Sequence, residues 1–77
     1  MNRTFYQFAL SYRGGKKNDD KAVFAEGMFK DLSFPKEETR YDPLSRYIEE
    51  KADEEMQSIV FDELYNIYID RVNPEFQ

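Results

Sequence analysis

The serines are the chain's candidate nucleophiles, but the sequence offers nothing that activates a serine in the usual way. A catalytic serine needs a neighbouring base, most often histidine, and the 77 residues include neither histidine nor cysteine. Ser45 follows Asp42 by three residues, a spacing that suits the first turn of a helix. The same lack of a base applies to Ser11, Ser33 and Ser58. We therefore expect no catalytic residue and no enzymatic activity.

Carboxylates are abundant, but their clustering favours helix faces and helix ends over acid–base chemistry. Paired carboxylates act as acid and base only where a pocket raises the pKa of one of them. Runs such as Glu49-Glu50 and Asp53-Glu54-Glu55 are typical of exposed faces and of helix N-termini, where the helix dipole stabilises negative charge. A metal would have to be a hard cation such as calcium, and the acid spacing of a calcium-binding loop is absent. We expect no metal and no cofactor.

A short basic stretch is the candidate phosphate contact. It surrounds Gly14-Gly15 in an expected loop and consists of Arg13, Lys16, Lys17 and Lys21. Cationic side chains that meet a phosphate backbone supply most non-specific nucleic-acid affinity. The net charge of −5 opposes such binding, so we expect nucleic acid to bind weakly at best. Weak nucleic-acid binding through Arg13–Lys21 is the alternative function.

A second apolar group on the last expected helix is the candidate partner surface. On a helical projection Met56, Val60 and Ile67 lie well off the main apolar stripe, and Ile59 lies further round. A central helix that is contacted from several sides would explain this group. The alternative interpretation is an exposed seam for a partner helix. Both interpretations stay open at the level of sequence.

Helical spacing predicts the elements of the first half. Thr4 is a plausible N-cap for a helix that Gly14-Gly15 ends. Asp19 or Asp20 caps a second helix, in which Gly27 suggests a close approach of another helix. The apolar stripes of these two helices are Phe5, Phe8, Ala9 and Tyr12, then Phe24, Ala25, Met28, Phe29 and Leu32.

Proline marks the boundaries of the second half. Pro35 prevents the second helix from continuing. We expect Phe34 to pack inward where this segment crosses between the two halves of the chain. We expect one short turn over Lys36 to Arg40. Asp42 as N-cap and Pro43 as the first helical residue then predict a helix to about Ala52. Asp53-Glu54-Glu55 then predicts the N-terminus of a last helix, which runs to about Val72, where Asn73-Pro74 stops it. Its main stripe is Phe61, Leu64, Tyr65, Tyr68 and Val72. Nothing alternates with period two, so we expect no strand.

The length predicts one domain over residues 1–77, with 73–77 as a flexible tail. A chain this short has a thin core, and without disulfides or zinc ligands it must rely on its seven Phe and six Tyr. The expected core comprises Phe5, Phe8, Phe24, Phe29, Leu44, Tyr47, Ile48, Phe61, Leu64 and Tyr68. The sequence shows neither a signal-peptide pattern nor a membrane-spanning run, so we expect a cytoplasmic protein with no membrane partner.

Charge is unevenly distributed along the chain. Residues 1–36 hold seven Lys/Arg and four Asp/Glu, or +3, whereas residues 37–77 hold four and twelve, or −8. Such asymmetry bears on association and not on fold. We expect a monomer or weak self-association, head to tail, with the basic part of one copy against the acidic part of the next.

A spaced set of motifs carries a resemblance to a known family. The matching segments are Phe5-Tyr6-Gln7-Phe8, Arg13-Gly14, Ala25-Glu26, Phe29, Leu32, Phe34-Pro35-Lys36, Leu44-Ser45, Tyr47-Ile48-Glu49 and Phe61-Asp62-Glu63-Leu64-Tyr65. The chain resembles the YozE-like family of short bacterial proteins. It departs from the pattern at Arg40, where relatives often carry an acid, and at Tyr65, where many carry tryptophan.

The resemblance implies a sterile-alpha-motif-like fold in which two helical hairpins pack across each other. It supplies no activity, cofactor or catalytic residue. We therefore predict a single all-α domain of four to five helices. Its expected role is non-catalytic protein–protein interaction with a partner that the sequence does not identify.

Overall fold

Four helices build the described part of the chain, which in this computed structural model comprises residues 3–16 and 18–72, with Val72 described by its backbone alone. The helices are α1 (Phe5–Leu10), α2 (Asp20–Lys30), α3 (Tyr41–Lys51) and α4 (Ser58–Val72). No strand occurs among these residues, so the all-α class is confirmed. The predicted tail, residues 73–77, lies outside the described residues.

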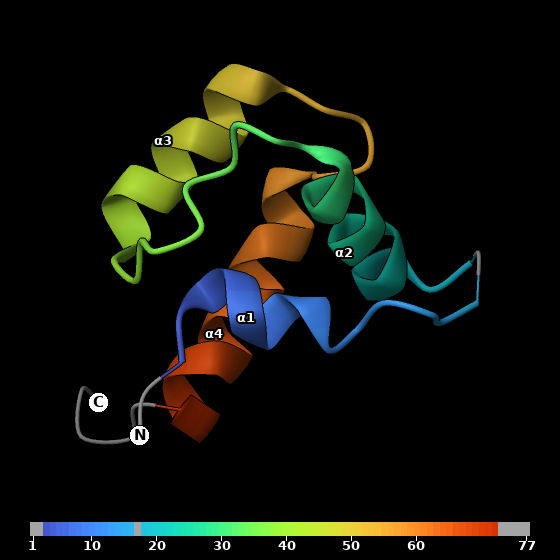
Figure 1. Ribbon diagram of the computed structural model, residues 1–77, viewed down its shortest axis with the longest axis horizontal. Helices are drawn as coiled ribbons and strands as arrows, with labels where there is room; N and C mark the ends of the chain where they lie inside the picture. The colour runs from blue at the N-terminus through green and yellow to red at the C-terminus, as the bar shows by residue number, and fades with distance from the viewer. Residues whose placement is uncertain (1–2, 17, 73–77) are drawn as a thin grey trace.

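The arrangement is two helical pairs joined by a crossing linker. Figure 1 shows α1 lying across α4, with α2 beside this pair and α3 at the opposite end of the picture. The long α4 packs against each of the other helices, and α1 also packs against α2. Within the described residues, the backbone of α3 approaches no helix except α4. The small sterile-alpha-motif-like bundle is therefore organised around α4.

Side-chain caps start the first two helices. The Thr4 hydroxyl accepts a hydrogen bond from the Gln7 amide and the Gln7 side chain accepts one from the Thr4 amide, each at 3.1 Å. Asp19 accepts from the amides of Lys21 and Ala22 at 3.0 and 3.4 Å. Both predicted caps are confirmed. The end of α1 was placed too late, because the helix stops at Leu10 and continues as turns to Gly14, whose φ is +89°.

The predicted starts of α3 and α4 are wrong. α3 begins at Tyr41, so Asp42 and Pro43 both lie in its first turn. The Glu38 carboxylate accepts hydrogen bonds from the amides of Thr39 and Arg40 at 3.1 and 3.0 Å. This turn immediately precedes α3, and Asp42 is not its N-cap. Proline is tolerated there because first-turn amides have no partner within the helix.

The acids ahead of α4 form a turn of their own. The Asp53 carboxylate accepts from the Glu55 amide at 2.8 Å, and α4 starts only at Ser58. The predicted end of α3 is confirmed, because Ala52 follows the helix in the left-handed conformation with φ 49°. Gly27 does mark a close approach, but to this turn and not to a helix, because a Cβ there would lie 2.8 Å from the Glu55 Cβ.

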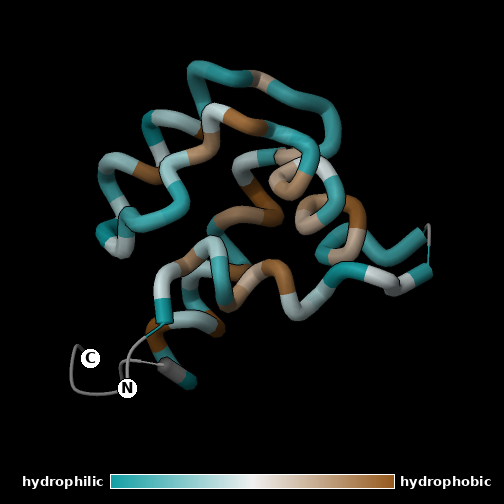
Figure 2. The backbone as a smooth tube through the Cα atoms, in the orientation of Figure 1, coloured by the Kyte–Doolittle hydropathy of each residue, from teal (hydrophilic) through white to brown (hydrophobic). Residues whose placement is uncertain are grey.

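Aromatic rings fill the core where α1, α2 and α4 meet, and Figure 2 shows hydrophobic residues along each of these helices. Phe5 lies at the centre, and its ring packs against four others, those of Phe24, Phe61, Tyr65 and Tyr68. Of the expected core, eight residues are confirmed as buried: Phe5, Phe8, Phe24, Leu44, Ile48, Phe61, Leu64 and Tyr68. A dense aromatic cluster thus takes the place of disulfides or metal.

Three apolar residues were placed too deep. Phe29 is 47% exposed, and the Arg13 guanidinium covers its ring at 3.7 Å. Leu32 is 87% exposed, because α2 ends at Lys30 and helical spacing no longer applies beyond it. Tyr47 is half-buried. α2 instead turns its small residues inward, and these include Ala22, Ala25 and Gly27.

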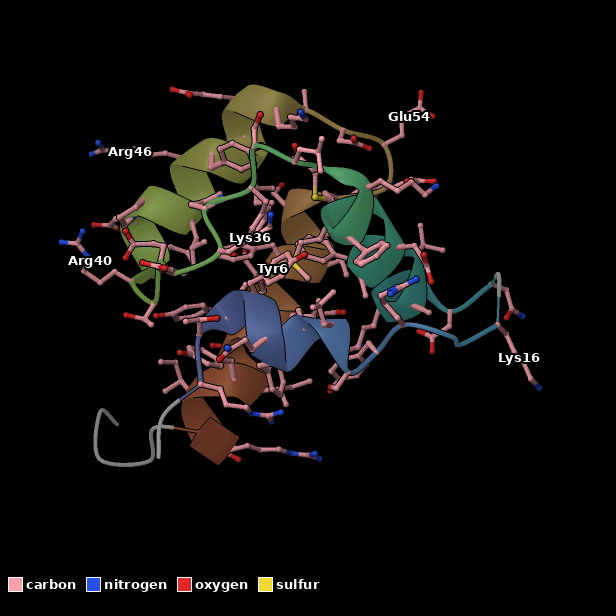
Figure 3. All side chains as sticks on the ribbon, in the orientation of Figure 1. Tyr6, Lys16, Lys36, Arg40, Arg46 and Glu54 are labelled. Atoms are coloured by element: carbon pink, nitrogen blue, oxygen red, sulfur yellow. The ribbon has the colours of Figure 1, made fainter. Side chains whose placement is uncertain are left out.

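The linker crossing behaves as predicted. Phe34 is buried and its ring lies between those of Tyr6, at 5.6 Å, and Tyr47, at 5.4 Å. It therefore connects α1 to α3, two helices whose backbones do not approach each other. In Figure 3 the labelled Tyr6 and Lys36 lie close together where the linker crosses in front of the bundle. The Lys36 ammonium is 5.7 Å from the Tyr6 ring centre.

Candidate partner-binding groove

The predicted partner surface is mostly buried. Met56 is 1% exposed and Val60 5% exposed, and both belong to the core. These two residues cannot form an exposed seam, so that part of the prediction is wrong. The cause is that the start of α4 is covered from two directions, by α2 and by α3. Ile67 is half-buried and lines a groove. Ile59 is a large apolar residue of α4 that is 67% exposed.

Two of the predicted phosphate contacts, Arg13 and Lys21, are paired with acids. Arg13 pairs with Glu26 at 3.2 Å, and Lys21 pairs with Glu63 at 3.6 Å. Lys16 projects from the loop before α2, far from Arg40 and Arg46 in Figure 3, and Lys17 lies outside the described residues.

The N-terminus of α2 is also a poor place for a phosphate. Asp19 already accepts from the two amides that an anion would use, and Asp20 adds a second carboxylate in the first turn. An approaching phosphate would meet negative charge instead of open donors. Weak nucleic-acid binding therefore stays a prediction of the sequence with no support from this geometry.

The charge asymmetry is partly satisfied within one molecule. Two ion pairs join a base of the first part to an acid of the second, Lys21–Glu63 at 3.6 Å and Lys30–Glu55 at 3.7 Å, whereas Lys51–Asp31 at 3.3 Å joins the two parts with the opposite polarity. Charges used in this way contribute less to a contact between copies. Head-to-tail association stays a prediction, with a smaller electrostatic basis than the sequence alone suggests.

Asp31 is the one charged residue that is buried in the described part of the chain. It accepts hydrogen bonds from the Tyr47 hydroxyl, the Ser33 amide at 3.0 Å and the Lys51 ammonium at 3.3 Å. Burial alone would raise the pKa of Asp31, but these three donors outweigh it and hold the pKa below its ordinary value. Burial and the bond to Asp31 raise the pKa of Tyr47 to about 12. The cluster clips α3 to the end of α2, which is a structural role.

A groove runs along α4. It has a volume of about 860 Å³ and is lined by Tyr41, Asp62, Tyr65, Asn66, Ile67, Ile69, Asp70 and Arg71. Asp62, Asn66 and Ile69 follow one another at helical spacing, so they share one side of α4. Phe61, Leu64 and Tyr68 occupy the other side and are fully buried. The groove combines half-exposed apolar surface with carboxylates.

Two tyrosines close one end of the groove. The Tyr41 hydroxyl donates to Asp62 at 2.8 Å, and the Tyr65 hydroxyl donates to the Thr39 carbonyl at 2.9 Å. Their rings are 5.2 Å apart and inclined by 69°. The hydrogen bond to Asp62 is the main cause that raises the pKa of Tyr41. Both rings are thereby held in fixed orientations, with Tyr41 40% exposed.

The groove brings two tyrosine rings together with carboxylates. No three carboxylates of the described residues converge closely enough to hold a metal ion. Sequence reasoning placed Tyr65 in the core stripe and gave Tyr41 and Asp62 no role. The groove depends on α3 starting at Tyr41, which the Asp42-Pro43 signal concealed. None of the helices in the described residues has the length and apolar character needed to cross a bilayer.

Comparison with known proteins identifies the family. A family model described as the YozE SAM-like fold matches residues 4–70. The chain belongs to this family. A UPF0346 protein of Staphylococcus epidermidis is 49% identical over 67 residues, which cover 87% of this chain and 88% of that protein. A UPF0346 protein of Levilactobacillus brevis is 38% identical over 69 residues, covering 90% and 94% respectively.

These relatives confirm the resemblance that the spaced motifs indicated. The names of the YozE SAM-like relatives state no activity, ligand or partner. No solved structure matches the chain. Function must therefore be argued from the groove itself.

Proposed function

We propose that this protein is a non-catalytic protein-interaction module, and that its α4 groove binds a basic, partly apolar segment of a partner protein. The observation that supports this most is the groove's composition. Half-buried Tyr65, Ile67 and Ile69 offer apolar contact, and Asp62 offers negative charge beside it. Mixed surfaces of this kind suit an amphipathic segment, whose apolar side chains supply affinity and whose charges supply orientation.

Charge complementarity determines the kind of partner. Residues 37–77, which supply every residue of the groove, carry a formal charge of −8. A basic segment is attracted to this part of the molecule, and an acidic segment or nucleic acid is repelled. The charged contacts lie at the surface, so binding should weaken as ionic strength rises.

Site-specific photo-crosslinking tests the proposal in the protein's own cells. A photoreactive amino acid replaces the exposed, groove-lining Asn66, and a matched control carries it at Glu50, an exposed residue of α3 outside the groove. We expect protein adducts that depend on illumination at position 66 and are absent at position 50. Equal adducts at both positions, or none at position 66, would contradict the proposal.

The captured partner then provides a quantitative test. After purification it should bind the wild-type protein and bind Asn66→Arg at least about tenfold more weakly, because the new cation repels a basic segment and fills the groove. Glu50→Arg introduces the same charge elsewhere and should change affinity much less. A partner that binds both variants alike does not use the groove.

A further inference from the structure

The corner between α3 and α4 is the most specific part of the groove. The rings of Tyr41 and Tyr65 pack edge to face at an angle of 69°, with the Tyr41 ring the more exposed of the two, and Asp62 borders them through its bond with the Tyr41 hydroxyl. The Thr39 carbonyl accepts from the other hydroxyl. Both tyrosine hydroxyls are thus occupied, and the corner offers a ligand aromatic faces and a carboxylate in a preformed arrangement.

The Asp62 carboxylate can accept further hydrogen bonds. Its Oδ1 accepts from Tyr41, while no donor among the described residues bonds to Oδ2, and no described cation lies within ion-pair distance of it. The neighbouring Glu63 differs in this respect, because Lys21 pairs with it at 3.6 Å. Arg71 lines the same groove but follows Asp62 by nine residues, or about 13 Å along the helix.

We propose that the corner formed by Tyr41, Asp62 and Tyr65 binds one cationic side chain of the partner, preferentially an arginine. The inference rests on the proposed function and names the anchor residue of that partner. Aromatic faces attract cations through the ring quadrupole, and a carboxylate beside the rings adds a charge-assisted hydrogen bond.

Arginine suits the corner better than lysine. A guanidinium is planar, so it can stack on the exposed ring of Tyr41 while an N–H donates to Asp62 Oδ2. The chain itself contains the same stacking, because the Arg13 guanidinium lies 3.7 Å from the Phe29 ring centre and pairs with Glu26. An ammonium is a compact point charge and would use the ring less well. An anionic group would be repelled by Asp62.

A peptide pair tests the anchor directly. The probe is a short alanine–leucine peptide with one central arginine, and its match carries citrulline, which has nearly the same shape without the charge. Titration of the whole protein, followed by backbone amide shifts in NMR spectra, reports affinity and location together. We expect shifts at Tyr41, Asp62 and Tyr65, with the arginine peptide bound about fivefold more tightly than the citrulline peptide. A lysine peptide should fall between them.

Two variants identify the group responsible. Asp62→Asn should abolish the difference between the arginine and citrulline peptides, because it removes the charge and keeps the shape. The matched variant Glu50→Gln makes the same charge change outside the groove and should preserve the difference. Equal binding of arginine and citrulline peptides by the wild-type protein would overturn the inference, as would identical effects of Asp62→Asn and Glu50→Gln.

The failure of this inference is distinguishable from that of the proposed function. If crosslinking at position 66 captures a partner but citrulline replaces arginine without loss, the interaction module stands and the cation anchor does not. If the peptides discriminate by charge yet no adduct forms at position 66 in cells, the corner binds cations but the proposed function fails.

Discussion

The two sides of α4 differ in how completely other parts of the protein cover them. On one side Phe61, Leu64 and Tyr68 are fully buried among the rings of α1 and α2. On the other, Asp62, Asn66 and Ile69 line an open groove, at one end of which hydrogen bonds to Asp62 and Thr39 hold Tyr41 and Tyr65 in place. The buried side accounts for the stability of a small domain. The groove side leaves apolar surface and the Asp62 carboxylate exposed, and we propose that a partner binds there.

The largest expected effect belongs to the buried side. Phe61→Ala should cost about 3–5 kcal/mol of unfolding free energy, because it leaves a cavity among the rings of Phe5, Phe24, Tyr41 and Tyr65. Urea unfolding measures the change. The control Leu32→Ala removes an apolar side chain that is 87% exposed and should stay within about 0.5 kcal/mol of wild type. Similar losses in both variants would mean that burial does not separate the two positions.

The linker should come next. Phe34→Ala should cost about 3 kcal/mol, the low end for such a truncation, because Phe34 is buried between the rings of Tyr6 and Tyr47. Since the ring connects α3 to the rest of the molecule, amide hydrogen exchange should accelerate more in α3 than in α2. Uniform acceleration across both helices would show that α3 does not open separately.

The buried carboxylate should contribute less than either ring. Asp31→Asn keeps the shape of the side chain but replaces one acceptor oxygen with an NH₂ group facing Tyr47, Ser33 or Lys51. We expect a loss of about 1–3 kcal/mol in the unfolding free energy. Thermal or urea unfolding of this variant beside the exposed control Asp20→Asn measures it. A loss no larger than that of Asp20→Asn would mean that the Asp31 cluster is not a clip.

The same cluster predicts how stability depends on pH. The pKa of Asp31 is lowered in the folded protein, so its contribution is present above the ordinary carboxyl pKa of 3.8 and is lost as pH falls below that value. The pKa of Tyr47 is raised from 10.0 to about 12, so its contribution is present below pH 10 and is lost as pH rises through about 12.

Tyr47→Phe separates this alkaline effect from that of other tyrosines. Tyr41 and Tyr65 also have raised pKa values and contribute to alkaline destabilisation. The variant should reduce the slope of unfolding free energy against pH above pH 10 without removing it. An unchanged slope would mean that Tyr47 does not titrate with folding.

The sequence predicted the structure correctly where local capping and spacing rules were not overridden by tertiary contacts. Thr4 and Asp19 are caps as predicted, and the buried stripe of α4 follows from spacing alone. It failed where tertiary contacts decide. The Asp42-Pro43 signal placed the start of α3 too late because Glu38 organises the turn before it. Phe29 was assigned to the core because spacing cannot show that Arg13 covers it.

The groove was beyond the reach of the sequence for the same reason. Its corner requires Tyr41 and Asp62, 21 residues apart, to meet across two helices. Among the residues that line the groove, the sequence assigned Ile67 alone to a partner surface. It did so together with Met56 and Val60, which are buried. A helical projection shows which side of a helix a residue occupies, but not what covers that side.

The most direct measurement compares stability and binding in one groove variant. Asn66→Arg alters an exposed residue, so its melting temperature should stay within about 2–4 °C of wild type. Its affinity for the partner captured at position 66 should nevertheless fall at least about tenfold, while Glu50→Arg binds nearly as wild type. This outcome would separate a side of α4 that folds the protein from a side that binds. An unchanged affinity in the stable Asn66→Arg variant would contradict the account.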